Sequence, residues 1–313
     1  MFDVNKGFKL STISIKEHKL LKDFEIDFTD KEDNPLPIIV IAGVNGSGKT
    51  TLLEYIQKIH YSDLLYIETL ENNILDLKQY ILSNFRKESR KLDSYSKALK
   101  KIQAFMEELF DGFDTKFYID DIDDTDRYNE KIIFKNSTND EFKIEELSTG
   151  EKTLISKILY LYFKDVKDKV ILIDEPELSL HPSWQNKILK LYETFAEKNN
   201  CQIIIATHSP HIIGSAKNEW IRLLSEDGVI SNFSKSYGLE FDKILTDIMG
   251  VENLRTPDVA KKIDKLWKFL EDEEYLSSEY KILYKELENI VGDLDKDLVL
   301  ARLEVAKLKR ENA

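Results

Sequence analysis

The octapeptide GVNGSGKT (43–50) constrains the fold of this chain more than any other segment. It follows the continuous apolar run PIIVIA (37–42), which is typical of a fully buried strand, and it precedes TLLEYIQKI, whose apolar residues recur at helical intervals. A glycine-rich loop between a strand and a helix directs backbone N–H groups and the positive end of the helix dipole toward phosphate oxygens. The segment therefore predicts a nucleotide-binding α/β fold.

The side chains of this loop can contact a nucleoside triphosphate and its metal ion directly. Lys49 can reach the β- and γ-phosphates, and the hydroxyl of Thr50 can hold Mg²⁺. The glycines at 46 and 48 let the backbone curl around the phosphates. The residues that we expect to bind ATP in this segment are Asn45, Gly46, Ser47, Gly48, Lys49, Thr50 and Thr51.

A second buried-strand pattern, VILIDE (170–175), ends in two carboxylates. An ionised carboxylate at the end of a buried strand needs a cation, so we expect Asp174 to act with Thr50 as a residue of the Mg²⁺ site. Glu175 is then placed to accept a proton from the attacking water or to orient that water. We expect Glu175 to be catalytic.

Two shorter motifs complete the candidate site. LSTGE (147–151) places Ser148 and Gly150 at the start of a helix, which is another anion-binding position. ATHSP (206–210) places His208 directly after a buried strand, where it can form a hydrogen bond with a γ-phosphate. We expect Ser148 and Gly150 to bind the nucleotide and His208 to be catalytic.

Strand and helix patterns alternate along residues 1–234, which predicts a mixed, largely parallel sheet with helices on both faces, preceded by an antiparallel β part. A polar, helical insertion is expected at about 61–111, and residues 116–135 read as two strands around an acidic turn. Residues 235–313 carry only helical patterns. We therefore expect an ATPase head at 1–234 and a helical C-terminal region at 235–313 that docks a partner or mediates oligomerisation.

In chain order these motifs resemble those of ATP-binding-cassette (ABC) ATPases. GVNGSGKT resembles Walker A, LSTGE the signature, VILIDE Walker B, SLH (179–181) the D-loop and His208 the switch histidine, although the signature departs from the transporter form LSGGQ at Thr149 and Glu151. DEPELSLHP (174–182) followed by THSP resembles the RecF, SMC-like and OLD-type group of AAA-family ATPases. The head with its helical tail looks similar to the Septu-type and retron-associated anti-phage defence ATPases.

The resemblance implies an ATP hydrolase that uses Mg²⁺ and forms a homodimer or higher oligomer. Each ATP would lie between the Walker A loop of one head and Ser148 and Gly150 of another. It also implies a separate effector protein, a nuclease, in anti-phage defence or DNA-linked metabolism. Two alternatives stay open: the ATP-binding subunit of an ABC transporter, which the D-loop histidine and the helical tail disfavour, and a RecF-like DNA repair ATPase without an effector.

Charge and composition bear on location and on nucleic-acid binding. The chain has a net charge of −13 and one cysteine, and no apolar run approaches the roughly 18 residues of a membrane helix. We therefore expect a cytoplasmic protein without membrane contact. Against the acidic background, residues 84–101 hold seven Lys/Arg and two acidic residues, and Arg86, Arg90 and Lys97 could share one helix face. This stretch is a candidate DNA or RNA contact, with a solvated helix as the alternative.

Two questions stay open in the sequence. The glutamine of the Q-loop is not identified, and Gln79 and Gln103 are both candidates. The acidic segments DDIDDTD (120–126) and GDLDKD (292–297) read as turns rather than as a second, nuclease active site.

Overall fold

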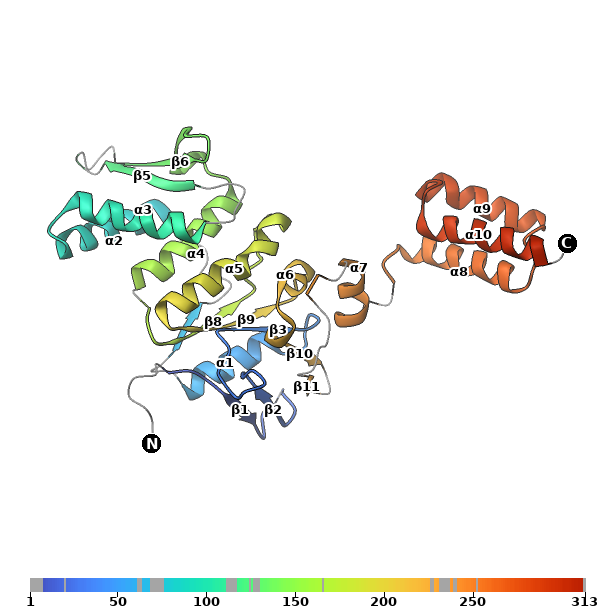
Figure 1. Ribbon diagram of the computed structural model, residues 1–313, viewed down its shortest axis with the longest axis horizontal. Helices are drawn as coiled ribbons and strands as arrows, with labels where there is room; N and C mark the ends of the chain where they lie inside the picture. Colours follow the sequence, from blue (N-terminus) through green and yellow to red (C-terminus); the bar gives the residue numbers. More distant parts are fainter. Residues whose placement is uncertain are drawn as a thin grey trace. The chain divides into compact units, whose positions relative to one another are not determined.

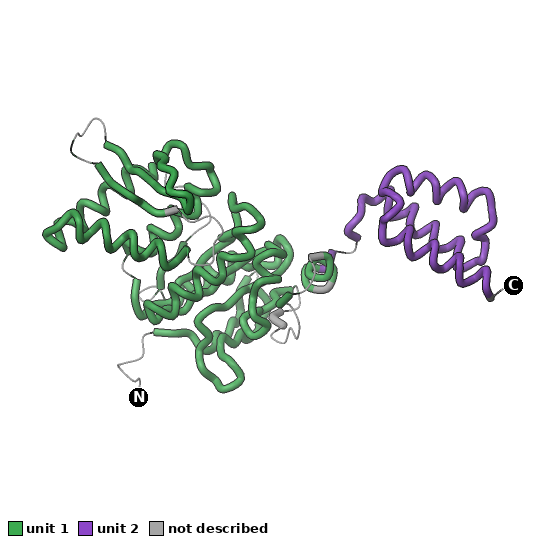
Figure 2. The backbone as a smooth tube through the Cα atoms, turned by 45° about the horizontal axis from the view of Figure 1, so that its top comes forward, with its two compact units in different colours: residues 1–249 green, residues 250–313 purple. Residues whose placement is uncertain are grey.

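The computed structural model describes residues 8–19, 21–60, 64–67, 76–110, 117–123, 125, 130–164, 166–225, 228–230, 237–238, 241–251 and 253–311. The chain forms two compact units, which comprise residues 1–249 and 250–313 (Figure 2). The first unit carries all the motifs of the candidate nucleotide site. No helix in the described ranges combines the length and the apolar character needed to cross a bilayer.

A six-stranded sheet in the order β11-β10-β3-β9-β8-β4 forms the centre of the first unit. Its strands are parallel except for the antiparallel pair β10–β11. The runs of β3, β8 and β9 are buried along their whole length, as the continuous apolar patterns predict. The strands are β3 (Ile38–Ala42), β4 (Leu64–Ile67), β8 (Val170–Asp174), β9 (Gln202–Thr207), β10 (Ile221–Ser225) and β11 (Gly228–Ile230).

Helices cover both faces of this sheet, as expected. Figure 1 shows α1 on one side, and α4 and α5 on the other. The loops that follow the parallel strands lie together at the carboxyl ends of those strands, which is where α/β folds bind ligands. The helices are α1 (Lys49–Ile59), α4 (Thr149–Lys164), α5 (Pro182–Asn199) and α6 (Pro210–Ser215), with short 3₁₀ turns η2 (Ile144–Glu146) and η3 (Asn218–Trp220).

An antiparallel part precedes the sheet, as predicted, and consists of β1 (Thr12–Ile15) and β2 (Phe24–Asp27). The insertion contains α2 (Leu77–Lys91) and α3 (Tyr95–Leu109), which begin at capping residues Asp76 and Ser94. A three-stranded antiparallel sheet follows, formed by β5 (Phe117–Asp123), β6 (Lys131–Asn136) and β7 (Glu141–Lys143). The predicted strand pair around an acidic turn is therefore present, whereas residues 124 and 126–129 of that turn lie outside the described residues.

The helical insertion predicted at about 61–111 contains one strand that the sequence did not indicate. Residues Leu64–Ile67 form β4, which pairs in parallel with β8 at the edge of the main sheet. Tyr66 and Ile67 are buried there. A four-residue apolar run has no period of its own, so only its pairing with β8 distinguishes a strand from a helical turn.

The first unit extends beyond residue 234, where the sequence placed the end of the head. The short helical elements α7 (Phe241–Lys243) and η4 (Ile244–Ile248, a π-helical turn) precede the boundary at Met249. Ile244 and Ile248 belong to the hydrophobic core of the first unit. A Cβ atom added to Gly214 of α6 would lie 2.6 Å from the Ile244 side chain, so this segment packs tightly against the head.

The second unit is a bundle of α8 (Pro257–Glu271), α9 (Ser278–Val291) and α10 (Lys296–Glu311) with its own core (Figure 2). The guanidinium of Arg255 binds Asp295 at 2.8 Å and Asp297 at 2.6 Å. The acidic segment 292–297 is therefore a turn between helices that is closed by an arginine. The buried core residues are Val259, Ile263, Leu266, Leu270, Tyr275, Tyr280, Leu283, Leu287, Leu298 and Ala301.

Candidate nucleotide site

The phosphate loop (residues 43–50) has the strand–loop–helix geometry that its sequence predicts. It joins β3 to α1, and Gly48 is the N-cap residue of α1. Gly46 and Gly48 have φ angles of +83° and +94°, a region that residues with a Cβ rarely adopt. Asn45 lies exposed at the top of the loop and Thr51 in the first turn of α1. The two glycines thus give the loop a backbone conformation that other residues rarely adopt.

Lys49 is buried within the phosphate loop. Its Nζ donates hydrogen bonds of 2.9 Å to the carbonyl oxygens of Gly43 and Val44. Burial lowers the pKa of the Lys49 ammonium, while the charges of Glu175 and Asp174 oppose that shift. The Oγ atom of Ser47 is also buried and has no hydrogen-bond partner among the described residues. A phosphate oxygen is an acceptor that both side chains could use.

Thr50 of α1 and Asp174 at the end of β8 are joined by a hydrogen bond. The Thr50 Oγ1 donates to Asp174 Oδ2 at 2.9 Å, although 124 residues separate them. A hydroxyl and a carboxylate are hard oxygen ligands, and Mg²⁺ in nucleotide sites takes one or two such protein ligands together with phosphates and water. No group of three or more His, Cys, Asp or Glu residues that could hold a metal occurs in the described part of the chain. The pair fits Mg²⁺ bound together with a nucleotide, rather than a metal held by protein alone.

Glu175 and His208 form the second pair of the site. Glu175 follows β8 and His208 follows β9, and the Glu175 Oε1 lies 3.0 Å from the His208 Nδ1. The backbone N–H of Glu175 donates to the Ala206 carbonyl at 2.9 Å, and Glu175 has a φ of +46°, which costs backbone energy. Both side chains are partly exposed. A carboxylate held beside an imidazole at the edge of a nucleotide loop can accept a proton from water.

Glu177 has contacts at this site that the sequence did not predict. Its side chain is buried and accepts hydrogen bonds from the Thr207 hydroxyl and the His208 backbone N–H. The only signal in the sequence was a third carboxylate in DEPE (174–177), in a run whose other acidic residues already had roles.

The helix that carries the signature motif begins as the sequence predicts. Ser148 Oγ accepts from the Glu151 N–H at 3.3 Å, and Glu151 Oε2 accepts from the Ser148 N–H at 2.7 Å. This reciprocal arrangement is a capping box, so Glu151 stabilises the helix start in a motif that departs from the transporter form. The Ser148 hydroxyl thus bonds within its own helix turn, and Ser148 and Thr149 are exposed.

Gly150 brings this helix close to the D-loop of the same chain. A Cβ atom at this position would lie 2.9 Å from the Ser179 carbonyl oxygen and 3.3 Å from the Trp184 ring. His181 of the D-loop is the N-cap residue of α5, and its Nδ1 lies 2.8 Å from the Ser183 hydroxyl. The histidine and proline of SLHP thus start α5, with Pro182 at its first position.

Neither candidate for the Q-loop glutamine lies in this site. Gln79 Nε2 donates to Glu130 Oε2 at 3.3 Å, and Gln103 Nε2 donates to the Asp120 carbonyl at 3.0 Å. Both side chains therefore hold the insertion helices against the β5–β6 hairpin. The role of either as a nucleotide ligand is not supported by these contacts.

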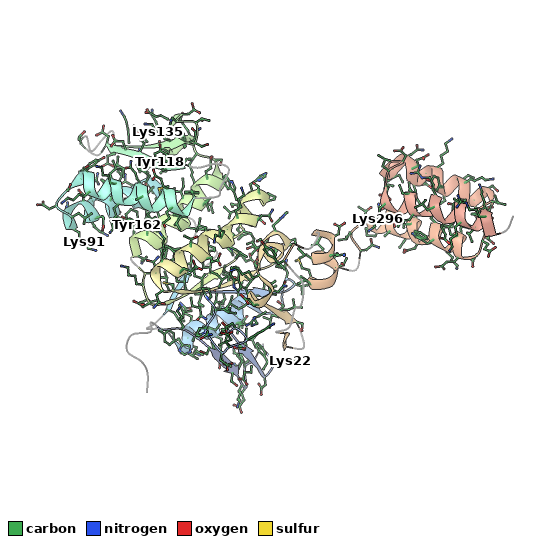
Figure 3. All side chains as sticks on the ribbon, viewed as in Figure 1. Lys22, Lys91, Tyr118, Lys135, Tyr162 and Lys296 are labelled. Atoms are coloured by element: carbon green, nitrogen blue, oxygen red, sulfur yellow. The ribbon has the colours of Figure 1, made fainter. Side chains whose placement is uncertain are left out.

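The basic stretch 84–101 does not place Arg86, Arg90 and Lys97 on one helix face. Because α2 ends at Lys91 and α3 begins at Tyr95, Arg86 and Arg90 lie on a different helix from Lys97. Arg86 forms an ion pair with the buried carboxylate of Glu130, so it holds the insertion together. Figure 3 shows Lys91 at the end of α2. The exposed basic residues are Lys87, Arg90, Lys91, Lys97, Lys100 and Lys101.

Parts of the chain are similar to known proteins. Residues 59–214 match a family described as "AAA domain, putative AbiEii toxin, Type IV TA system". The chain is 34% identical over 201 residues to the Septu protein PtuA of Bacillus thuringiensis, a match that covers 57% of this chain and 49% of PtuA. It is 29% identical over 189 residues to the "Retron Ec83 probable ATPase" of Escherichia coli, covering 56% of this chain and 34% of that protein. It is also 34% identical over 85 residues to the OLD nuclease of Thermus scotoductus, covering 26% and 16%.

The fold and the site together define a P-loop ATPase domain of the ABC class. Residues 59–214 resemble AAA domains, and the relatives of the chain include a Septu protein, a retron ATPase and an OLD nuclease. The chain spans about half or less of the length of these curated relatives.

Proposed function

We propose that this protein hydrolyses ATP in a head-to-head homodimer and thereby controls a separate nuclease in anti-phage defence. The observation that carries the proposal is the convergence of two pairs, Thr50–Asp174 and Glu175–His208, around the phosphate loop. Each pair joins segments that are more than 30 residues apart in sequence. The first pair suits Mg²⁺ and the second suits activation of water.

In the proposed reaction, the oxygen of a water molecule attacks the γ-phosphorus while the bond to the β–γ bridging oxygen breaks. Glu175 accepts the proton of the attacking water, and ADP leaves with the bridging oxygen. His208, held by Glu175, is placed to donate a hydrogen bond to a γ-phosphate oxygen. Lys49 exchanges its carbonyl partners for phosphate oxygens. Mg²⁺ held by Thr50 and Asp174 would neutralise charge on the phosphates.

The dimer part of the proposal is supported by the position of the signature motif. The chain has one phosphate loop and one LSTGE motif. Ser148 is exposed at the start of α4 and forms its side-chain hydrogen bond within the first turn of that helix, a position that suits contact with a second molecule. A two-fold dimer would place the Ser148 and Gly150 of each head against the ATP of the other.

The nuclease and defence parts rest on the relatives and on the second unit. The relatives include a Septu protein and a retron ATPase, the types of anti-phage defence ATPase that the sequence resembles, and another relative is named an OLD nuclease. In the second unit, large apolar side chains are exposed on α9, α10 and their connection, including Leu294 at 83% and Leu303 at 62%. Apolar side chains exposed on a helical bundle suit a protein partner.

Four forms of the protein test hydrolysis: the parent, Lys49→Ala, Glu175→Gln and the control Glu197→Gln, which changes an exposed glutamate on α5. Glu175→Gln should bind ATP with near-parental affinity, lose hydrolysis by a factor of about 100 or more, and accumulate a dimer in light scattering with ATP. Lys49→Ala should lose nucleotide binding, and Glu197→Gln should behave as the parent. Parental hydrolysis by Glu175→Gln would show that Glu175 is not the base.

Partner docking is tested with the Glu175→Gln protein, which should hold any ATP-dependent complex. Captured from its native host with ATP, it should retain a nuclease subunit. The added pair Leu294→Asp and Leu303→Asp should release that subunit, whereas Leu254→Asp, at another exposed apolar position of the second unit, should not. Retention by all three forms would exclude this surface of α9 and α10 as the docking site.

A further inference from the structure

Glu177 connects the carboxylate loop (residues 174–181) to the end of β9. Its side chain is only 5% exposed. The Oε1 atom accepts hydrogen bonds from Thr207 Oγ1 at 2.6 Å and from the His208 N–H at 3.0 Å. The Oε2 atom is buried and has no hydrogen-bond partner among the described residues. One carboxylate oxygen thus fixes the backbone at the point where the switch histidine leaves the sheet.

His208 is held by two carboxylates at two different atoms. Glu177 accepts from its backbone N–H, and the Glu175 Oε1 lies 3.0 Å from its ring Nδ1. The Glu177 Oε1 is also 3.6 Å from that ring nitrogen. Because both glutamates belong to one short loop, the position of the imidazole depends on the position of that loop.

The carboxylate loop is in turn held by two helices. Lys157 of α4 donates from Nζ to the Pro176 carbonyl at 2.6 Å, within the buried interior. Gln185 of α5 donates to the Leu180 carbonyl at 3.0 Å, and its Oε1 accepts from the Ser209 hydroxyl at 2.7 Å. Since α4 begins with the signature motif, a rigid connection runs from Ser148 to the loop that bears Glu175 and Glu177.

The environment of Glu177 is unfavourable for a purely structural role. Within the described ranges its only ion pair closer than 4.0 Å is the 3.6 Å contact with the His208 ring, although its charge also acts on the buried ammonium groups of Lys157 and Lys49. A buried carboxylate with an unbonded oxygen reduces stability, and apolar residues of similar volume often replace buried charges without loss. Costly buried charges concentrate at functional sites.

We propose that Glu177 is a positioning residue for ATP hydrolysis, which holds His208 in its productive arrangement beside Glu175. This inference rests on the hydrolysis proposed above. Glu177 does not touch the reacting atoms; it acts through His208. Loss of its acceptor oxygen should therefore lower kcat and leave ATP binding, which depends on the phosphate loop, largely unchanged.

A double-mutant cycle tests this role. The variants are Glu177→Met, His208→Ala and the two combined, with Glu177→Gln as the conservative form. The control is Glu193→Met, which changes another buried carboxylate, one that pairs with Lys190 and Lys217 on the α5 side of the head. Glu177→Met should lower kcat about 10- to 100-fold with KM for ATP changed less than about threefold. Glu177→Gln, which keeps an acceptor oxygen, should recover most of the activity.

The combined variant should be no slower than His208→Ala alone, because Glu177 acts through that histidine. Multiplicative losses in the combined variant would overturn the inference, as would a loss in Glu193→Met equal to that in Glu177→Met. A second measurement does not depend on turnover. The ring-nitrogen NMR signals of His208, assigned with His208→Ala among the five histidines, should move in Glu177→Met and stay in place in Glu193→Met.

These measurements distinguish a failure of the proposed ATP hydrolysis from a failure of the proposed positioning role of Glu177. If the parent protein and Lys49→Ala release phosphate at the same rate, the proposed hydrolysis is wrong, and the NMR comparison still decides the role of Glu177. If the parent hydrolyses ATP but the His208 signals ignore Glu177→Met, only the positioning role is wrong.

Discussion

The free energy of unfolding of the head should rise with pH in the alkaline range because of Lys157. Its ammonium is buried in α4 and donates to the Pro176 carbonyl at 2.6 Å. Burial lowers the pKa of Lys157 from 10.5 to about 8, against an opposing contribution from Glu177. Because the folded-state pKa lies below the unfolded one, protonation of Lys157 costs stability. The cost is fully present below the folded pKa, and it disappears as pH rises through the unfolded pKa.

The magnitude follows from the shift. A difference of about 2.5 pKa units corresponds to a cost of about 3 kcal/mol at pH 7, which falls to about 1.5 kcal/mol at pH 9.5. Lys157→Met removes the titrating group and keeps a side chain of similar length. The unfolding free energy of the parent, relative to Lys157→Met, should therefore rise by about 2 kcal/mol between pH 7 and pH 9.5.

Chemical unfolding measured by tryptophan fluorescence provides the assay. Trp184 and Trp220 lie in the first unit and Trp267 in the second, so a Trp267→Phe background restricts the signal to the head. Both proteins are unfolded at pH 7 and at pH 9.5, and only the difference between them is compared, because other groups titrate equally in both. A difference that stays constant with pH would refute the assignment of a depressed pKa to Lys157.

Three further changes test other contacts. Gly150→Ala should displace the start of α4 from the D-loop, because the added Cβ would lie 2.9 Å from the Ser179 carbonyl. We expect the free energy of unfolding, measured by thermal unfolding, to fall by about 1 kcal/mol, because the cost of overpacking exceeds the gain in helix propensity from alanine. Unchanged stability would contradict the close approach of the helix to the D-loop. Arg255→Ala leaves Asp295 and Asp297 without their cation and should destabilise the second unit by about 2 kcal/mol, measured through Trp267 fluorescence with the exposed Arg310→Ala as the matched control. If DNA binds the insertion, the combination of Lys87→Glu, Arg90→Glu and Lys91→Glu should weaken salt-sensitive binding at least about tenfold in fluorescence anisotropy, and unaltered binding would exclude this surface.

The sequence predicted the parts of the site that depend on local pattern or on the topology of a parallel sheet. The phosphate loop follows from its spacing and glycines. Asp174 and His208 follow from the rule that carboxyl ends of neighbouring parallel strands lie together, and β8 and β9 are indeed neighbours. The roles of these residues in binding and catalysis stay predictions, since they depend on a nucleotide.

Contacts between distant segments were not predictable in the same way. The residues around DEPE do not indicate that Glu177 accepts a hydrogen bond from Thr207, which is 30 residues away. Nor do they indicate that Lys157 of α4 donates one to the Pro176 carbonyl. The ion pair of Arg86 with Glu130 is also a contact between distant segments, so the sequence did not show that Arg86 is bound within the insertion. Likewise, residues 64–67 form a strand because they pair with β8, and a four-residue sequence pattern does not specify that pairing.

If each ATP site is built from two molecules, mixing two inactive variants should restore hydrolysis. Lys49→Ala loses the phosphate loop and keeps the signature, whereas Ser148→Arg loses the signature and keeps the phosphate loop. In a head-to-head dimer, a mixed pair contains one intact site, so an equal mixture should recover about a quarter of the parental ATPase rate if pairing is random and the sites are independent. Phosphate release by the mixture that stays at the level of the separate variants, at every mixing ratio, would contradict the composite site.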